Sequence, residues 1–282
     1  MYLKDFRIHF NKELSTLFPQ TEIDTFFFLL IEKELKLQRV DLVLNTQLSI
    51  PKEKFEHLYN ALARLKTQEP IQYILEETEF YGLPFKVSKD TLIPRPETEE
   101  LVEWIINDCK DKSNISILEI GTGSGCIPVT LAKNLPNATI SSIDISKNAL
   151  AVAKENAIIN NVNVNFIEQD ILKTDKLPQQ YDIIVSNPPY VRELEKAEIK
   201  PNVLENEPHL ALFVTDNNPL IFYSKIADLA KKHLKKSGVL YFEINQYLGN
   251  ETVEMLSKKE FTTELKKDLF GNNRMTKSIL KP

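Results

Sequence analysis

Between residues 113 and 245 the sequence alternates short apolar, β-branched runs with helical stretches. The expected strands are ISILEI (115–120), ATISSIDI (138–145), VNFIEQ (164–169), YDIIVS (181–186) and GVLYFEIN (238–245). Helical patterns separate the first strands, and Ser146 is the expected cap of the second helix. Strands that alternate with helices form a parallel sheet covered on both faces. The pattern therefore predicts an α/β fold with a Rossmann-like sheet.

The end of the chain predicts a different strand arrangement. The segments FTTELKKDLF and RMTKSILKP flank the sequence GNN, which is a strong hairpin signal. We therefore expect the parallel sheet to finish in a C-terminal antiparallel hairpin.

The part of the chain before residue 75 has no glycine and reads as helical. One of its helices is expected to begin at Thr21 as the N-cap. We predict a small all-helical domain over residues 1–75, an accessory or docking module without a catalytic motif of its own. A hairpin linker around Gly82 follows over residues 76–95, and the α/β domain covers residues 96–282.

The start of the α/β domain leaves two interpretations open. The sequence RPETEELVEWII predicts a helix with Pro96 in its first turn and acidic residues at its positive end. Arg95 to Thr98, held by two prolines, either belong to a plain linker or line a site.

Composition bounds the kind of protein. The chain of 282 residues has a formal net charge of -5, which offers no general attraction to phosphate backbones. Cys109 and Cys126 form no CxxC or Cys/His pattern, so we expect no disulfide framework and no metal. The charged start and the short FFFLLI run predict no signal peptide and no membrane span, and hence a cytoplasmic protein.

Three of the seven glycines lie in EIGTGSGC, between a predicted strand and a predicted helix. Such crowding brings main-chain N–H groups close to a ligand at a helix N-terminus. The spacing GxGxG differs from the dinucleotide pattern GxGxxG, so a pyrophosphate fits it less well. The predicted cofactor loop consists of Gly121, Thr122, Gly123, Ser124 and Gly125.

Acidic residues end the next two predicted strands. Asp144 lies about twenty residues after the glycines, where a carboxylate accepts hydrogen bonds from both ribose hydroxyls. Asp170 is placed to accept from an adenine amino group while Ile171 packs on the ring; a plain helix cap is the alternative for Asp170. Because ligands in such sheets bind at the carboxyl ends of strands, these positions together predict a nucleoside site.

The fourth strand end carries the sequence SNPPYV. The side-chain oxygen of Asn187 and the carbonyl oxygen of Pro188 can both accept hydrogen bonds, and Pro188 and Pro189 fix their direction. Two converging acceptors grip a planar –NH2 group, and Tyr190 can pack against its plane. Holding both N–H groups raises electron density on a nitrogen that is otherwise a poor nucleophile. The loop therefore predicts methyl transfer to a planar nitrogen.

EIGTGSG, IDIS and SNPPY in this order resemble the class I S-adenosyl-L-methionine-dependent methyltransferases that modify nitrogen. PIQYI, FYGLPFKV, LIPRPETEELVE, SNPPYV and EPHLAL narrow the resemblance to the HemK/PrmC family of peptide chain release factor glutamine methyltransferases, over nearly the whole chain. The resemblance implies a class I methyltransferase fold, S-adenosyl-L-methionine as cofactor, and N5-methylglutamine in the Gly-Gly-Gln loop of release factors as product.

The same resemblance implies residue roles. It places the cofactor loop on residues 121–125, the ribose acid on Asp144, the adenine side on Asp170 and Ile171, and the substrate-amide clamp on residues 187–190. Asn187 lies at both the cofactor and the substrate. The family usually has a glycine before the adenine-side acid and often an aromatic residue after it, where this chain has Gln169 and Ile171.

Other functions remain possible at this point. A glutamine methyltransferase of a ribosomal protein shares NPPY, as do DNA and RNA amino methyltransferases, although the acidic balance disfavours a nucleic-acid substrate. A haem-pathway oxidase would need a flavin or metal pattern, which the sequence does not have. A non-enzymatic binding module would leave the glycine loop and the SNPPY motif unexplained. We expect a monomer that binds release factors, with no direct contact to nucleic acid or membrane.

Overall fold

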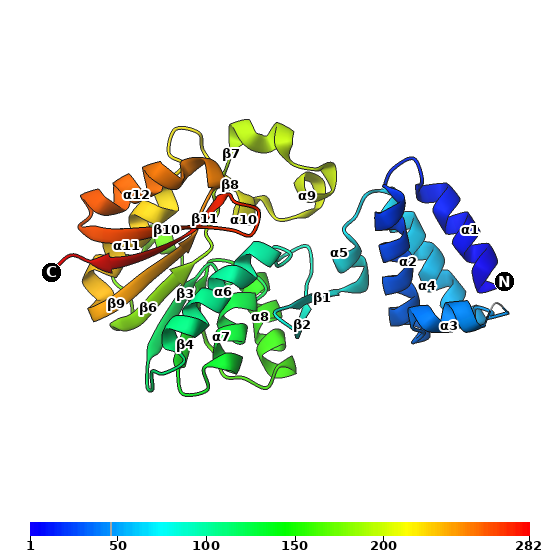
Figure 1. Ribbon diagram of the computed structural model, residues 1–282, viewed down its shortest axis with the longest axis horizontal. Helices are drawn as coiled ribbons and strands as arrows, with labels where there is room; N and C mark the ends of the chain where they lie inside the picture. Colours follow the sequence, from blue (N-terminus) through cyan, green and yellow to red (C-terminus); the bar gives the residue numbers. More distant parts are fainter. Residues whose placement is uncertain (46) are drawn as a thin grey trace. The chain divides into compact units, whose positions relative to one another are not determined.

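The computed structural model describes residues 1–45 and 47–282. The chain divides into two compact units, which are described separately. The helical unit comprises Met1–Glu76 and Pro201–Asn206, and the α/β unit comprises Glu77–Lys200 and Glu207–Pro282. Figure 1 gives the labels of the helices and strands. In the described part of the chain, no helix is both long and apolar enough to cross a membrane.

The helical unit packs around aromatic side chains. Its helices are α1 (Leu3–Leu14), α2 (Gln20–Leu35), α3 (Arg39–Leu44), α4 (Lys52–Lys66), α5 (Ile71–Leu75) and α9 (Pro201–Asn206). Phe6, Phe10 and Phe27 meet in the core with ring centroids 5.7 to 6.3 Å apart. Leu58 and Leu62 of α4 are buried against them, as the apolar spacing of that helix requires.

The expected N-cap at Thr21 is wrong. Helix α2 begins at Gln20 and its N-cap is Pro19, whose backbone is extended (φ -66°, ψ 151°). The fixed φ of a proline suits the residue that enters a helix. Thr21 therefore lies inside the first turn, where its carbonyl oxygen accepts a hydrogen bond from the Thr25 hydroxyl at 2.8 Å.

The α/β unit contains a seven-stranded sheet in the order β10-β11-β9-β6-β3-β4-β5. The strands are β3 (Ser116–Ile120), β4 (Thr139–Asp144), β5 (Asn165–Glu168), β6 (Tyr181–Ser186), β9 (Leu234–Glu243), β10 (Phe261–Lys267) and β11 (Asn273–Leu280). The strands β9, β6, β3, β4 and β5 run parallel to their neighbours. Strand β11 is antiparallel to both β9 and β10. The predicted α/β fold class, with its C-terminal antiparallel hairpin, is confirmed.

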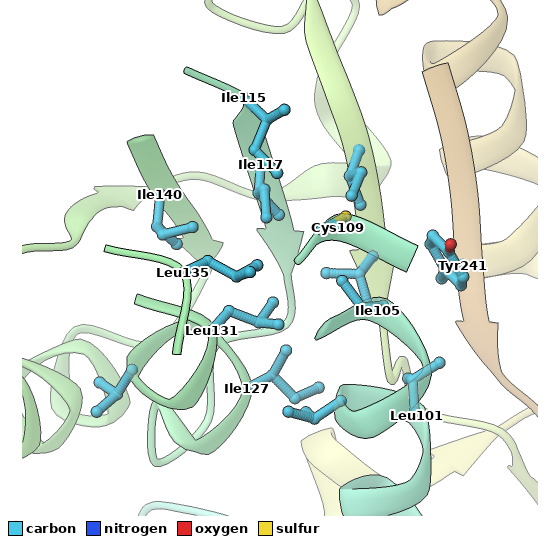
Figure 2. Close-up of a cluster of buried hydrophobic side chains, with 14 of the residues drawn as sticks. Leu101, Ile105, Cys109, Ile115, Ile117, Ile127, Leu131, Leu135, Ile140 and Tyr241 are labelled. Atoms are coloured by element: carbon cyan, nitrogen blue, oxygen red, sulfur yellow. The ribbon is translucent and has the colours of Figure 1, made fainter. Parts of the chain in front are cut away.

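Helices cover both faces of the sheet (Figure 1). One face carries α6 (Pro96–Cys109), α7 (Cys126–Asn134) and α8 (Lys147–Ile159), and the other carries α11 (Ile221–His233) and α12 (Gly249–Lys258). Figure 2 shows Leu101 and Ile105 of α6 beside Ile127 and Leu131 of α7. Burying each such side chain contributes roughly 1.5–3 kcal/mol, so the sheet is a rigid platform for the loops at its edge.

Shorter elements complete the α/β unit. The hairpin of β1 (Glu77–Phe80) and β2 (Leu83–Lys86) turns at Gly82, as the sequence predicts. The chain after β6 forms β7 (Val191–Arg192), the 3₁₀ helix η2 (Glu193–Glu198), α10 (His209–Leu212) and β8 (Phe213–Val214). The other 3₁₀ helices are η1 (Ile171–Lys173) and η3 (Gln246–Leu248).

The strand order reverses at β3. The chain runs outward from β3 through β4 to β5, then crosses to β6 and β9 on the other side of β3. A crevice outside the carboxyl ends of β3 and β6 is where open α/β sheets bind their ligands. The two loops singled out in the sequence follow these two strands.

Candidate functional site

The glycine loop and the SNPPY loop meet at the switch point of the sheet. Ile120 of β3 is in register with Ser186 of β6, and the Ser186 hydroxyl donates to the Ile120 carbonyl oxygen at 2.6 Å. Gly121 and Asn187 are the next residues. A Cβ atom on Gly121 would lie 3.6 Å from the carbonyl oxygen of Asn187. The two predicted motifs therefore lie in contact at this edge of the sheet, and the positive φ of Gly121 (+95°) favours glycine there.

The glycines of the loop have different physical tasks. Gly123 has φ +51°, and a Cβ atom there would meet nothing within 4 Å, so its backbone faces open space. Gly125 has φ +82°, and its Cβ would lie 2.9 Å from Cβ of Ala153 in α8. The absence of a side chain thus exposes main chain at Gly123 and allows close helix packing at Gly125.

Asp144 at the end of β4 holds the glycine loop. Its Oδ2 accepts from the Gly123 N–H at 2.9 Å, and its Oδ1 accepts from the Ser146 N–H at 2.8 Å. The side chain is half-buried, and burial raises the pKa of its carboxyl above the usual value. The Ile145 N–H also interacts with this carboxylate, which has about four acceptor positions and so keeps capacity for a ligand hydroxyl.

Asp170 and Ile171 lie at the neighbouring strand end. The Gln169 N–H donates to the Asp144 carbonyl oxygen at 2.9 Å, which places this segment beside the end of β4. The Asp170 carboxylate accepts from the Leu172 N–H at 3.0 Å and pairs with Lys173 at 3.1 Å. The cap that the sequence left as an alternative is thus present, and a role at an adenine stays a prediction. The Ile171 side chain is buried.

Residues 187–190 are held from three sides. Pro188 is buried, and Asn187, Pro189 and Tyr190 are half-buried. The Asn187 Nδ2 donates to Thr98 Oγ1 at 3.3 Å, and the Tyr190 hydroxyl donates to Glu243 Oε1 at 3.1 Å. The amide Nδ2 of Asn245 donates to the Tyr190 carbonyl oxygen at 2.9 Å. The loop is therefore fixed by side chains of α6, β9 and the residues after β9.

Glu243 belongs to none of the motifs that the sequence predicts. It is 1% exposed, and burial raises the pKa of its carboxyl. The Thr98 hydroxyl donates to its Oε2 at 2.6 Å. A lone acid in the apolar strand GVLYFEIN was the available signal, because unpaired charges are rarely buried.

Glu119, two residues before the glycine loop, also belongs to none of the predicted site residues. Its Oε2 accepts from the Ser142 hydroxyl at 2.5 Å, and Ser142 also contacts the Thr122 hydroxyl at 2.5 Å. Its Oε1 has no hydrogen-bond partner in the described part of the chain. Burial raises the pKa of Glu119 to about 8. A carboxyl with an unpaired buried oxygen behind the glycine loop is suited to a ligand with a hydrogen-bond donor.

Residues 95–98 were expected to be either a plain linker or the lining of a site, and their contacts differ along the segment. Thr98 is 2% exposed and reaches the SNPPY loop, whereas Arg95 pairs with Glu207. Within the described residues, no group of three or more His, Cys, Asp or Glu side chains could hold a metal ion.

Two family models match the chain. The PrmC N-terminal domain matches residues 9–75, and the Methyltransferase small domain matches residues 98–211. The "Release factor glutamine methyltransferase" of Flavobacterium psychrophilum is 56% identical over 98% of this chain and 99% of its own length. The protein of the same name from Bacteroides thetaiotaomicron is 41% identical over 95% of this chain and 96% of its own.

Solved structures share the fold. A methyltransferase from Pyrococcus furiosus is 20% identical with a TM-score of 0.51, over 78% of this chain and 96% of that one. The ribosomal protein L11 methylase of Lactobacillus delbrueckii subsp. bulgaricus is 16% identical with a TM-score of 0.51, over 70% of this chain and 84% of that one. At such identities the likeness concerns the fold alone.

Proposed function

Because the chain belongs to the release factor glutamine methyltransferase family, we propose that it methylates the side-chain amide nitrogen N5 of the glutamine in the Gly-Gly-Gln loop of peptide chain release factors. The observation that carries this proposal is the meeting of the glycine loop and residues 187–190 at one switch point. Gly121 has no side chain at the place where a Cβ would lie 3.6 Å from the Asn187 carbonyl oxygen. A methyl donor on one side and an acceptor amide on the other need that proximity.

The loop residues fit S-adenosyl-L-methionine as the cofactor. The open space at Gly123 lets a ligand approach the main chain closely, and the remaining acceptor positions of Asp144 suit a ribose. Ile145 is 47% exposed beside Asp144 and offers apolar surface for a purine ring. The bound cofactor supplies a methyl group already activated on a sulfonium. Asp170 and Ile171 belong to the proposed adenine side.

Residues 187–190 would hold the acceptor. Asn187 Oδ1 and the Pro188 carbonyl oxygen each accept one N–H of the glutamine amide, and the ring of Tyr190 packs against its plane. Pro188 and Pro189 restrict the backbone, so the acceptors are fixed before the substrate arrives. Two acceptors on one –NH2 group increase the electron density on nitrogen and aim it at the cofactor.

A clamp of four residues cannot choose one glutamine among many, so we propose that the helical domain of residues 1–75, which belongs to the helical unit, docks the release factor. Helix α3 exposes Val40, Val43 and Leu44, which at spacings of three and four share one helical face. Specific protein interfaces bury on the order of 1,200 Å² or more, which needs a surface beyond the clamp. The acidic chain and its translational partner fit a cytoplasmic monomer that makes no direct contact with nucleic acid.

Methyl transfer from labelled cofactor tests the proposal. Release factor, ribosomal proteins and DNA are offered separately, and the label is expected only in release factor. Asn187→Ala should lower single-turnover transfer by about 30- to 1,000-fold, because one positioned acceptor is worth roughly 2–4 kcal/mol in a transition state. Its cofactor affinity should change little. Label in ribosomal protein or DNA would identify a different substrate class.

A further inference from the structure

Thr98 lies between Asn187 and Glu243 in a chain of hydrogen bonds. The Asn187 Nδ2 donates to Thr98 Oγ1 at 3.3 Å, and the Thr98 hydroxyl donates to Glu243 Oε2 at 2.6 Å. The three residues come from the loop after β6, the first turn of α6 and the end of β9. Thr98 and Glu243 are almost fully buried, so water does not compete for these bonds.

The order of donors in this chain determines which way the Asn187 amide faces. A carboxylate only accepts hydrogen bonds, and a hydroxyl has one proton to donate. Because Thr98 gives its proton to Glu243, its oxygen can only accept from Asn187. The amide must then present Nδ2 to Thr98 and direct Oδ1 away from it. In the proposed function, that oxygen is the acceptor for the glutamine –NH2 group.

The same carboxylate fixes the second member of the clamp. Glu243 Oε1 accepts from the Tyr190 hydroxyl at 3.1 Å, while its Oε2 serves Thr98. Arg274, whose guanidinium hydrogen-bonds Asp268, places positive charge near Glu243 and partly offsets the burial of the carboxylate. One buried acid thus sets both the amide of Asn187 and the ring of Tyr190.

We infer that Thr98 and Glu243 are positioning residues of the methyl-acceptor site, which impose on Asn187 the amide orientation that binds a substrate –NH2 group. The inference rests on the proposed function, because it assigns a task to Asn187 Oδ1. Neither residue needs to touch the substrate. Both act through the orientation of residues that do.

Two substitutions at Thr98 separate the hydroxyl from the space that the side chain fills. Thr98→Val keeps the shape and leaves the Asn187 amide without its acceptor, so both amide orientations become accessible. We expect kcat on release factor to fall about 10- to 100-fold, with KM and the Kd of S-adenosyl-L-methionine within about twofold. Thr98→Ser keeps the hydroxyl and should restore most of the rate.

Glu243→Gln reverses the donor order. Its carboxamide can accept from Tyr190 and donate to Thr98, whose proton then faces Asn187. The amide is expected to turn its oxygen toward Thr98 and present Nδ2, a donor, to the substrate –NH2 group. We predict a loss in kcat at least as large as that of Thr98→Val, without a lower unfolding temperature. A merely structural Glu243 would give the opposite pattern, with lost stability and a retained rate.

A matched control and a double-mutant cycle complete the test. Thr263 of β10 lies outside the site, and its hydroxyl forms a hydrogen bond of 2.9 Å with the Ser278 hydroxyl of β11. Thr263→Val removes this hydroxyl and should leave kcat unchanged. In an Asn187→Ala background, Thr98→Val should add almost no further loss, since the residue it orients is gone.

Near wild-type kcat for Thr98→Val, equal impairment of Thr98→Ser and Thr98→Val, or additive losses in the cycle would each overturn the inference. These Thr98 variants decide it even where Glu243→Gln does not fold. Failure of the proposed function is seen separately, because the wild-type enzyme would then leave release factor unlabelled.

Discussion

Arg95 and Glu207 form an ion pair in which the carboxylate side chain has no exposure to solvent and the guanidinium is 31% exposed. One Glu207 oxygen receives the Arg95 guanidinium, and the other accepts from the Ile93 N–H at 3.1 Å. The pair ties the segment before α6 to the segment before α10. It thereby holds the first turn of α6, which carries Thr98, in place.

Glu207→Gln should destabilise the α/β unit. The new amide –NH2 must face either the Arg95 guanidinium or the Ile93 N–H, both of which are donors, in a buried setting. The substitution also leaves Arg95 without its countercharge. We expect the free energy of unfolding to fall by about 2 kcal/mol or more. Glu205→Gln, a change of the same kind at an exposed neighbour, should have almost no effect.

Fluorescence of Trp104 makes that measurement specific to one unit. Trp104 is the single tryptophan of the chain, and it lies in α6 with its ring 5.7 Å from that of Tyr241. Urea unfolding followed at Trp104 therefore reports the α/β unit without a signal from tryptophan in the helical unit. An unchanged midpoint for Glu207→Gln would show that the pair contributes nothing to the stability of the α/β unit.

Asp144→Ala should weaken cofactor binding roughly 10- to 100-fold, because charged hydrogen bonds are worth about 1.5–3 kcal/mol. It also releases the Gly123 and Ser146 N–H groups, so a small loss of stability should accompany the loss of affinity. Titration calorimetry checks the affinity. Glu168→Ala, which removes an exposed acid in register with Asp144 on β5, is the control and should bind normally. Equal affinities in wild type and Asp144→Ala would remove Asp144 from the site.

Glu119 predicts a pH dependence of stability in the cofactor-free protein. Burial raises its folded-state pKa to about 8, whereas the unfolded chain ionises near 4.5. The unfolded state therefore releases a proton between these values that the folded state keeps. The stability from the neutral carboxyl is complete below about pH 4.5 and is lost as pH rises toward 8, at up to roughly 1.4 kcal/mol per pH unit.

Glu119→Gln should remove that contribution. Its amide cannot ionise, so its unfolding free energy should fall less between pH 5 and pH 8 than that of the wild type. Urea unfolding at several pH values provides the comparison. Asp144, whose pKa is also raised, is present in both proteins, so the difference between their curves reports Glu119 together with its interaction with Asp144. Parallel pH curves for the two proteins would mean that Glu119 is ionised in the fold.

The docking proposal predicts a difference between whole substrate and peptide. Val43→Asp places a charge on a residue that is 78% exposed in α3, so the fold should tolerate it. We expect kcat/KM on intact release factor to fall at least about 10-fold, while the low rate on a short Gly-Gly-Gln peptide stays unchanged. Ile158→Asp, at a 75% exposed position of α8, is the matched control. Peptide and intact factor methylated equally well would argue against any docking surface.

Local patterns sufficed for most of the fold. β-branched runs marked β3, β4 and β6, and the GNN turn marked the hairpin of β10 and β11, because both signals are contained in neighbouring residues. Strand β9 begins at Leu234, four residues before the predicted start at Gly238. The polar sequence LKKSG gives no strand signal. The extension depends on pairing with β6 and not on the intrinsic strand propensity of these residues.

The site was predictable only where a motif is contiguous. The glycine loop and residues 187–190 each occupy a few positions, so their chemistry could be inferred before the fold was known. The contact between Thr98 and Glu243 joins positions 145 residues apart, so the local sequence around one residue carries no information about the other. The sequence marked residues 95–98 as a possible site lining but did not single out Glu243, and only tertiary packing brings Thr98 and Glu243 together.

Mass mapping of the methylated residue tests the central claim most directly. Intact release factor is incubated with the enzyme and S-adenosyl-L-methionine, digested and fragmented, and a factor with the Gly-Gly-Gln glutamine replaced serves as control. We predict one added methyl group on the side-chain amide of that glutamine and none on the control. A methyl group on another residue, or an unmodified release factor, would contradict it.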